Sequence, residues 1–313
     1  MTPRRPLPAA ADPRQRLTAI GLMVLATVCF AALDSSAKYL VGREGIPVAE
    51  VTWLRFIGHV VFSAVVLWPF ALRPSLRSAK PLVQVLRSGL MVVTTGFNFV
   101  ALRYLQLDQT ITIFFLTPLI VAALAGPLLH EWVGWHRVLA IVAGFVGVLI
   151  VMHPGFGGLH WAMLLVLIAT AGYALYNIAT RYLAAYDPPE VTQTYTPLFG
   201  MVVMAPFALA AWQWPQDALT SLLFVSLGFW GGLGHWLLIL AHRHAPAPVL
   251  APFIYLGLIW MSLVGFLVFG DVPTLWTLSG AAIVILSGLY LLARERKAMG
   301  AAKAGPAADI ATQ

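Results

Sequence analysis

Three charged side chains of this 313-residue sequence stand in or beside long apolar segments, where ionisable groups usually have a function. Asp34 lies near the end of the apolar segment 17–40, Lys38 follows four residues later on the same helical face, and Arg55 lies in the segment 48–70. Because Asp34 and Arg55 are expected at similar depth, we predict a buried ion pair between them. Two roles stay open for the pair: a structural link between two helices, or a gate or proton-coupling group that breaks and reforms.

The composition places these side chains in a membrane. Apolar residues make up 60% of the chain and charged residues 10%, and the mean hydropathy is +0.85. A bilayer core about 30 Å thick requires roughly 20 apolar residues per helical span. The apolar runs between short polar breaks predict ten spans, near 17–40, 48–70, 83–103, 109–129, 134–152, 159–182, 190–212, 218–241, 247–269 and 274–292.

The chain also contains one unit twice. Residues 17–40 match residues 160–183 at an offset that places Asp34 on Asn177 and Lys38 on Arg181. The triplet at 50–52 returns at 190–192, and 130–149 resembles 270–290. The position of Arg55 is taken by Tyr195 in the second copy, so the copies differ in charge where the predicted ion pair lies.

Five spans per copy is an odd number, so the second copy must enter the membrane from the opposite side. We therefore expect an all-α polytopic membrane protein with ten transmembrane helices as two inverted five-helix repeats, at 17–152 and 159–292. Residues 1–16 are expected to be a disordered cytoplasmic tail and 293–313 a second cytoplasmic tail. Inverted repeats are typical of secondary transporters that work by alternating access, with a substrate site where the halves meet.

The distribution of basic residues predicts the orientation. With both termini in the cytoplasm, the outer loops hold only Lys38, Arg43 and Arg103, and every other lysine and arginine of the loops and tails lies inside. The net charge of +7 then reflects this bias and does not indicate nucleic-acid binding. We predict a multi-pass protein of a bacterial inner membrane, with an uncleaved first helix, whose partners are the lipid bilayer and a small-molecule substrate. The sequence favours no oligomeric state.

The motifs give little support to an enzymatic function. The sequence contains no G-x-x-x-x-G-K-[ST] phosphate-binding loop, and His130-Glu131 is not followed by the second histidine of a zinc-protease motif. The single cysteine, Cys29, excludes an internal disulfide and a thiolate metal cage. We predict no catalytic residues, no metal and no cofactor. An intramembrane enzyme using Asp34, His59 or His235 is the remote alternative.

Three further features concern packing. Gly228 and Gly232, like Ala143 and Gly147, follow the small-xxx-small spacing of closely packed membrane helices. Prolines are expected to interrupt the fourth span at Pro118, the seventh at Pro197 and Pro206, and the ninth at Pro248 and Pro252, and to free backbone carbonyls. Lys38 with Glu50, and Arg181 with Glu190, are expected to form pairs at the membrane interface.

The whole ten-helix region resembles the drug/metabolite transporter superfamily and, within it, the EamA family. The resemblance is carried by WLRFIGHVV (53–61), by the stretch 97–135 and by the stretch 245–271, with the acids Glu131 and Asp271 before the fifth helix of each repeat. It implies an inner-membrane carrier with a central cavity lined by helices 1, 3, 4, 6, 8 and 9. The cavity residues that the resemblance then implies are Asn98, Phe114, Phe115, Tyr173, Tyr176, Asn177, His235 and Tyr255.

Finer patterns within the family leave several substrates open. LDSSAKYL, RF..H and FF.TPL look most like the branch of bacterial riboflavin importers, and sequences like the S-adenosylmethionine carriers share them. Riboflavin is planar and uncharged, which suits a cavity with aromatic side chains and few charges. Riboflavin or flavin uptake is thus the first expectation. A carrier of a nucleoside-like solute such as S-adenosylmethionine, or an exporter of amino acids or related metabolites, is the alternative. Facilitated diffusion, exchange and proton coupling all remain open.

Overall fold

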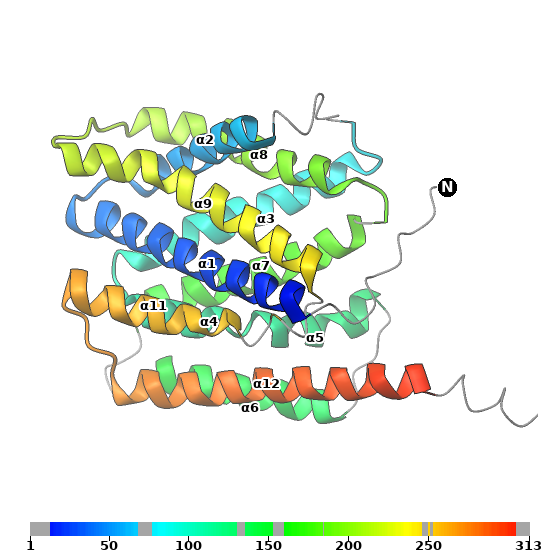
Figure 1. Ribbon diagram of the computed structural model, residues 1–313. Coiled ribbons are helices and arrows are strands. Elements are labelled where there is room, and N and C mark those ends of the chain that lie inside the picture. Colours follow the sequence, from blue (N-terminus) through cyan, green and yellow to red (C-terminus); the bar gives the residue numbers. More distant parts are fainter. Residues whose placement is uncertain are drawn as a thin grey trace, which may run out of the picture.

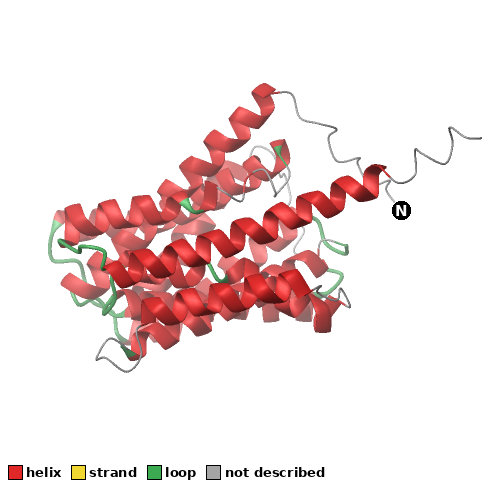
Figure 2. Ribbon diagram, turned by 90° about the horizontal axis from the view of Figure 1, so that it is seen from below, coloured by secondary structure: helices red, strands yellow, loops and turns green. Residues whose placement is uncertain are grey.

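The computed structural model describes residues 13–67, 77–129, 135–152, 160–183, 185–245, 250 and 253–304, and in these ranges every regular element is a helix (Figures 1 and 2). The elements are α1 (Pro13–Lys38), η1 (Tyr39–Arg43), α2 (Val48–Leu67), α3 (Pro81–Leu102), α4 (Leu107–Phe114), α5 (Thr117–Leu129), α6 (Trp135–Met152), α7 (Trp161–Leu183), α8 (Pro189–Ala210), α9 (Ala218–His244), α11 (Leu256–Val264), η2 (Gly265–Phe269) and α12 (Leu275–Ala304).

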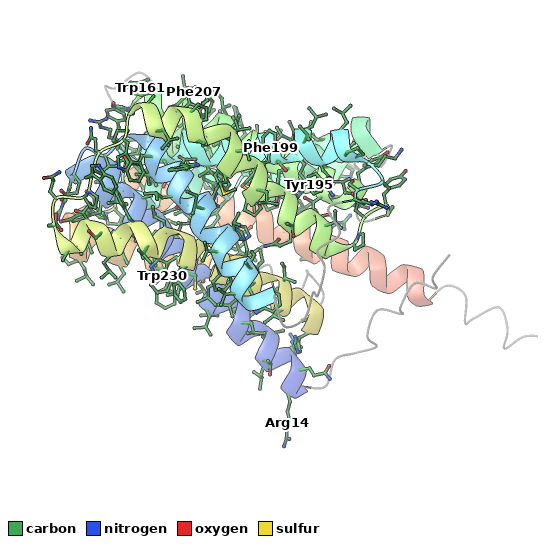
Figure 3. The ribbon with its side chains drawn as sticks, turned by 90° about the horizontal axis from the view of Figure 1, so that it is seen from above. Arg14, Trp161, Tyr195, Phe199, Phe207 and Trp230 are labelled. Carbon is green, nitrogen blue, oxygen red and sulfur yellow. The ribbon has the colours of Figure 1, made fainter. Side chains whose placement is uncertain are left out.

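The helices have the length and the surface of a membrane bundle. Five described segments are long and apolar enough to cross a bilayer: Arg14–Arg43, Val48–Val65, Pro81–Leu102, Trp161–Leu183 and Ala218–Ala241. Shorter apolar helical segments are Leu107–Val121, Val138–Met152, Leu256–Phe269 and Leu275–Leu291. Large apolar side chains such as Leu25, Val142, Val202 and Phe207 are exposed on the outer faces, while Arg14 projects beyond the bundle at the start of α1 (Figure 3). Such faces are stable against lipid and not against water.

Each main helix contact has a counterpart between the equivalent helices of the other repeat. By position in the duplicated unit, α1 corresponds to α7, α2 to α8, α3 to α9 and α6 to α12. The main contacts follow this correspondence. The packing of α1 on α9 is matched by that of α7 on α3, and the packing of α2 on α9 is matched by that of α8 on α3. In the remaining two contacts, α2 with α8 and α6 with α12, a helix packs on its own equivalent. In Figure 1, α1 ends at the left, where the chain enters α2, whereas α7 ends at the right, where the chain enters α8. Equivalent helices therefore run in opposite directions.

Glycines permit the closest helix crossing. A Cβ atom added to Gly228 of α9 would collide with the backbone of Gly58 in α2, and one added to Gly147 of α6 would press on Gly280 and Val284 of α12. The predicted role of Gly228 and Gly147 in close packing is confirmed. The crossing of α2 and α9 at Gly58 fixes the distance between these helices just beside the polar cavity described below.

The fourth predicted span is divided into two helices just before Pro118. Instead of one helix over 109–129, α4 ends at Phe114 and α5 begins at Thr117, with Pro118 in its first turn. Proline cannot donate to the carbonyl four residues earlier, which is that of Phe114. The hydroxyl of Thr117 donates to this carbonyl at 2.7 Å, so the polar group freed by Pro118 is satisfied locally.

Both ends of the described chain are more helical than the sequence suggested. α1 begins at Pro13, inside the segment expected to be a disordered tail, and α12 continues past the predicted span to Ala304. The extension of α12 is rich in alanine, arginine, lysine and glutamate, which have high helix propensity, so an apolar pattern marks only the part of the helix expected in lipid.

Candidate functional site

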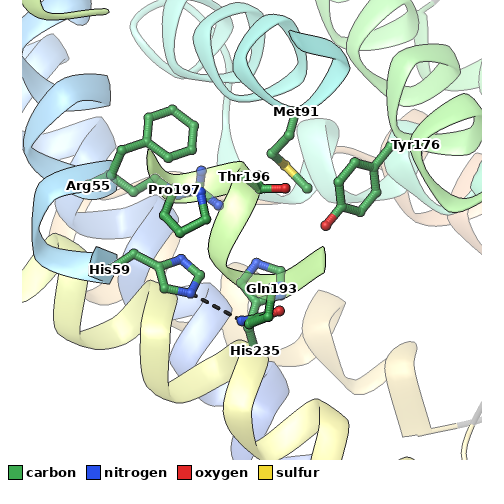
Figure 4. Close-up of a pocket in the computed structure, with 9 residues that line it drawn as sticks. Arg55, His59, Met91, Tyr176, Gln193, Thr196, Pro197 and His235 are labelled. Atoms are coloured by element: carbon green, nitrogen blue, oxygen red, sulfur yellow. Dashed lines mark hydrogen bonds between the residues drawn. The ribbon is translucent and has the colours of Figure 1, made fainter. Parts of the chain in front are cut away.

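A small polar cavity lies in the middle of the bundle, between α2, α3, α7, α8 and α9 (Figure 4). Its volume of about 10 Å³ is room for one water molecule, so the helices are closed around it. The lining residues are Arg55, Phe56, His59, Met91, Tyr176, Gln193, Thr196, Pro197 and His235. By helical rise, Arg55 and His59 lie about 10 and 17 Å from the start of α2, which places the cavity well inside the bundle.

Two histidines face each other across this cavity. The rings of His59 (α2) and His235 (α9) are stacked with centroids 5.6 Å apart, and Phe30 of α1 meets His235 edge to face at 5.2 Å. Gln193 of α8 lies within hydrogen-bond distance of His59, with 3.3 Å between Nε2 of each residue (Figure 4). Three helices thus present side chains that can either donate or accept a hydrogen bond.

Arg55 brings a charge to the cavity and keeps part of its hydrogen-bonding capacity. Its Nη1 donates to the hydroxyl of Thr95 in α3 at 2.7 Å, and its guanidinium lies 5.2 Å from the ring centre of Phe56. The side chain is 7% exposed, and its buried Nε has no hydrogen-bond partner within the described ranges. A buried donor without a partner is costly, so Nε keeps the capacity to bind one further acceptor atom.

The predicted ion pair between Asp34 and Arg55 is not formed. Asn98 donates to Asp34 through its Nδ2 at 3.3 Å, while Arg55 is bound by Thr95, one helical turn earlier on α3. The sequence comparison considered only α1 and α2. It missed that α3 supplies a neutral partner for each charge, Asn98 for Asp34 and Thr95 for Arg55.

Arg87 is the main polar residue whose role the sequence did not predict, because we expected it among the basic residues of the inner loops. It lies within α3, is 3% exposed and joins α3 to α7 and α8. Its Nε donates to Thr180 at 2.6 Å, its Nη1 to Thr196 at 2.8 Å and to the Thr192 carbonyl at 3.0 Å, and its Nη2 to the Tyr176 hydroxyl. Its place inside the apolar segment 83–103 was the available signal.

A row of aromatic rings continues from the cavity. Tyr176 stacks on Tyr173 with centroids 5.8 Å apart, and Tyr173 meets Phe114 of α4 edge to face at 6.4 Å. Asn177 donates to the carbonyl of Tyr173, four residues earlier on its own helix, at 2.7 Å. These contacts give the cavity one aromatic wall, which begins at Tyr176.

The eight predicted cavity residues thus fall into three groups. Tyr176 and His235 line the cavity; Tyr173, Phe114, Asn177 and Asn98 lie in the shell around it or beside Asp34. Phe115 and Tyr255 lie elsewhere: their rings meet edge to face at 4.9 Å, and the Tyr255 hydroxyl fills the space above Gly288 of α12. The cavity is also more cationic than predicted, because Arg55 lines it and Arg87 holds its Tyr176 wall.

The charged pairs at the helix ends also differ from the prediction. Lys38 binds Asp271, with 3.3 Å between Nζ and Oδ2, instead of Glu50. Glu50 is fully buried and accepts from the backbone N–H of Gln213 at 3.0 Å. The spacing of Lys38 and Glu50 in the sequence could not reveal that loops of the second repeat provide their partners. Glu131 and the side chain of Glu190 lie outside the described residues.

At the opposite end of the bundle, Asp187 closes the α7–α8 turn onto the start of α3. Its carboxylate accepts from the Ser78 hydroxyl at 2.5 Å, the Ala79 N–H at 2.7 Å and the Gln84 amide at 2.8 Å. Burial alone would raise the pKa of Asp187, but these three hydrogen bonds outweigh it and lower the pKa below its ordinary value.

A helical membrane protein whose equivalent halves enclose a buried polar cavity has the organisation of a membrane transporter. The chain belongs to the EamA-like transporter family, whose model matches residues 17–153 and 160–294. This membership confirms the family resemblance seen in the sequence, and it confirms that the chain is a transporter and not an enzyme.

Relatives named for two different substrates are equally similar to the chain. The S-adenosylmethionine uptake transporter of Rickettsia bellii (strain RML369-C) is 30% identical over 283 residues, which cover 90% of this chain and 95% of that protein. The riboflavin transporter of Vibrio cholerae serotype O1 is 30% identical over 282 residues, which cover 88% and 93%. A crystal structure with a TM-score of 0.63 and 17% identity covers 91% of this chain and 99% of its own, and it supports the fold alone.

Proposed function

We propose that the chain is a secondary transporter that moves a small metabolite across a bacterial inner membrane by alternating access. Its ten spans form two inverted repeats, 17–152 and 159–292, with both termini in the cytoplasm. Support comes from the matched contacts between equivalent helices of the two repeats and from the opposite directions of α1 and α7. The closed cavity at the meeting point of the halves is the proposed substrate site, and transport requires the helices around it to separate on one side at a time.

We propose riboflavin as the substrate, and the state of Arg55 carries this assignment. Its buried Nε offers a donor, and the flavin ring system is planar, uncharged and rich in carbonyl and ring-nitrogen acceptors. Tyr176 and Tyr173 offer a stacking wall, and Gln193 and the two histidines can bind the hydroxyl groups of the sugar-alcohol chain. Arg55 in the cavity lining and Arg87 on the Tyr176 side chain give the cavity a positive excess that disfavours a cationic solute.

S-adenosylmethionine is the second candidate, because relatives named for its uptake are as similar as those named for riboflavin. Its carboxylate could bind Arg55, and its sulfonium could lie over the tyrosine rings. Its net positive charge next to Arg55 and Arg87 makes it the weaker candidate.

The test is growth of a bacterial riboflavin auxotroph on low riboflavin, together with radiolabelled uptake. Wild-type protein and Arg103→Gln, an exposed arginine outside the cavity, should support growth and uptake. Arg55→Gln should lower uptake at least about tenfold at equal amounts of protein in the membrane, since a substrate-bound charged donor contributes about 1.5–3 kcal/mol. Absence of flavin uptake, with S-adenosylmethionine taken up through the same protein, would transfer the assignment to the second candidate.

A further inference from the structure

The end of the bundle where α1 and α11 finish has an unusual backbone. Both helices pass directly into π-helical turns, η1 and η2. In η1 the N–H of Glu44 bonds the Tyr39 carbonyl at 3.2 Å, five residues back, and η2 is terminated by Gly270 in the left-handed conformation with φ 74°. Wide turns of this kind are often found at functional positions in helices, because they redirect the side chains that follow.

These two turns meet, and they join the two repeats. Lys38 lies at the end of α1, and its Nζ is 3.3 Å from Oδ2 of Asp271, just after η2. The ring of Phe269 lies beneath two cations, Lys38 at 5.0 Å and Arg43 at 5.3 Å. Arg43 also donates to the Val268 carbonyl at 2.6 Å. Lys38 and Arg43 belong to the first repeat and the other three residues to the second, so this contact must break if the halves separate at this end.

A second carboxylate lies near the same lysine. Nζ of Lys38 donates to the carbonyl of Leu105 at 2.6 Å, and Asp108 follows three residues later at the start of α4. Asp108 is 3% exposed; its Oδ1 accepts from the N–H of Gln109, while its buried Oδ2 has no hydrogen-bond partner among the residues described. The charges of both Lys38 and Asp271 act on this carboxylate. Asp108 and Lys38 belong to the same repeat.

We propose that Lys38 is the moving member of a salt-bridge switch: it binds Asp271 when this end is closed and Asp108 when the end is open. Breaking the bond to Asp271 without a replacement would leave a half-buried cation unpaired, which is costly. Asp108 removes that cost because it stays with Lys38 when the repeats part, and the Leu105 carbonyl holds the amine beside it. The inference rests on the proposed alternating access and adds the residues that set the balance between its two states.

The test measures opening without any substrate. With Cys29 replaced by alanine, a single reporter cysteine is placed at Ala37, which is fully buried next to Lys38, and its rate of reaction with a water-soluble maleimide is measured in nanodiscs. Asp271→Asn removes the closed-state partner and should raise the rate at least about tenfold. Asp108→Asn removes the open-state partner and should lower the rate below that of the parent. The matched control is Asp217→Asn, because Asp217 binds Thr220 at the start of α9 and takes no part in the switch.

Two further results define the outcome. Exchange of the charges in Lys38→Asp/Asp271→Lys should restore slow labelling, and full labelling of every variant in denaturant shows that the reporter is intact. An unchanged rate in Asp271→Asn, or a rate in Asp108→Asn that rises as in Asp271→Asn, would overturn the switch. Riboflavin uptake is measured separately from labelling, so failure of the switch and failure of the proposed transport can be told apart.

Discussion

The two ends of the bundle join the repeats by different chemistry. At the end where α1 and α11 finish, the contact is between charges, with Lys38 bound to Asp271 and two cations over Phe269. At the other end, Arg87 and Asp187 bind backbone and neutral side chains across α3, α7 and α8. An ion pair can change partners at little cost where a second opposite charge lies nearby, whereas a dispersed network must lose several bonds at once. The difference indicates one switchable end and one firm end in the closed conformation.

The largest effect should follow from removal of Arg87. Arg87→Met leaves Thr180, Thr196, the Tyr176 hydroxyl and the Thr192 carbonyl without their donor. We expect a loss of at least about 3 kcal/mol in the free energy of unfolding, because each buried acceptor left without its donor costs about 1–3 kcal/mol. Thermal unfolding of the purified protein measures it, with Arg103→Met as the exposed control. Equal melting temperatures for the two variants would show that the network at this end is not firm.

Asp187 should make the same end sensitive to acid. Its folded-state pKa lies below the ordinary value, so its stabilisation is fully present above the unfolded pKa, about 4, and is lost as the pH falls through the folded pKa. Asp187→Asn should lower stability at pH 7 by about 1–2 kcal/mol, since charged hydrogen bonds become neutral ones. Unfolding measured from pH 7 to pH 3 should show a flatter decline for the variant than for the wild type. Parallel curves would contradict this role for the carboxylate.

Asp34 tests whether the inner charges also take part in coupling. The carboxylate binds neutral Asn98 and feels the charge of Arg55 without pairing with it, so it is free to gain or lose a proton during the cycle. We expect Asp34→Asn to keep measurable uptake but to remove its dependence on pH between about 5.5 and 8, where cells and proteoliposomes can be assayed. Asp34→Glu is the control that keeps the acid. An unchanged uptake rate and pH profile in Asp34→Asn would leave Asp34 a structural residue.

Two asparagines should differ in their effect on stability, and replacement of Asn177 should have the smallest effect of all. Asn98 binds Asp34 on another helix, whereas Asn177, which stands at the Asp34 position of the second repeat, interacts with Tyr173 of its own helix. Asn98→Leu should cost about 1–3 kcal/mol, because it removes a donor from a buried carboxylate, and Asn177→Leu less than about 0.5 kcal/mol. Thermal unfolding of both variants gives the difference. A larger loss for Asn177→Leu would remove the contrast between the repeats.

Much of the fold could be predicted from the sequence, because lipid imposes strong local rules. Apolar segment length located the helices, the repeat of 17–40 at 160–183 gave their correspondence, and the spacing at Gly228 identified a close crossing. The break at Pro118 was predicted as well, but the breaks predicted at Pro197 and Pro206 were wrong, because α8 continues through both prolines. Pro248 and Pro252 lie outside the described residues. The lengths of α1 and α12 were not, because helix propensity continues beyond the apolar pattern.

The pairing of polar groups could not be predicted in the same way. Lys38 and Asp271 are separated by more than two hundred residues, and nothing in the sequence ranks Asp271 above Glu50 as a partner. The partners of Asp34 and Arg55 were missed because both lie on α3, outside the two helices that the prediction considered. The partners of Arg87 were missed because they lie on α7 and α8, about one hundred residues further along the chain. In each case the answer depends on which helices meet, which only the three-dimensional packing determines.

The most direct test of the proposed function is uptake into proteoliposomes that contain only the purified protein, with radiolabelled riboflavin and S-adenosylmethionine measured side by side. We expect saturable riboflavin uptake that is lost in Arg55→Gln and kept in Arg103→Gln, with little uptake of S-adenosylmethionine. Riboflavin uptake that is absent, or that is equal in Arg55→Gln and wild type, would contradict the assignment of the cavity at Arg55 as a flavin site.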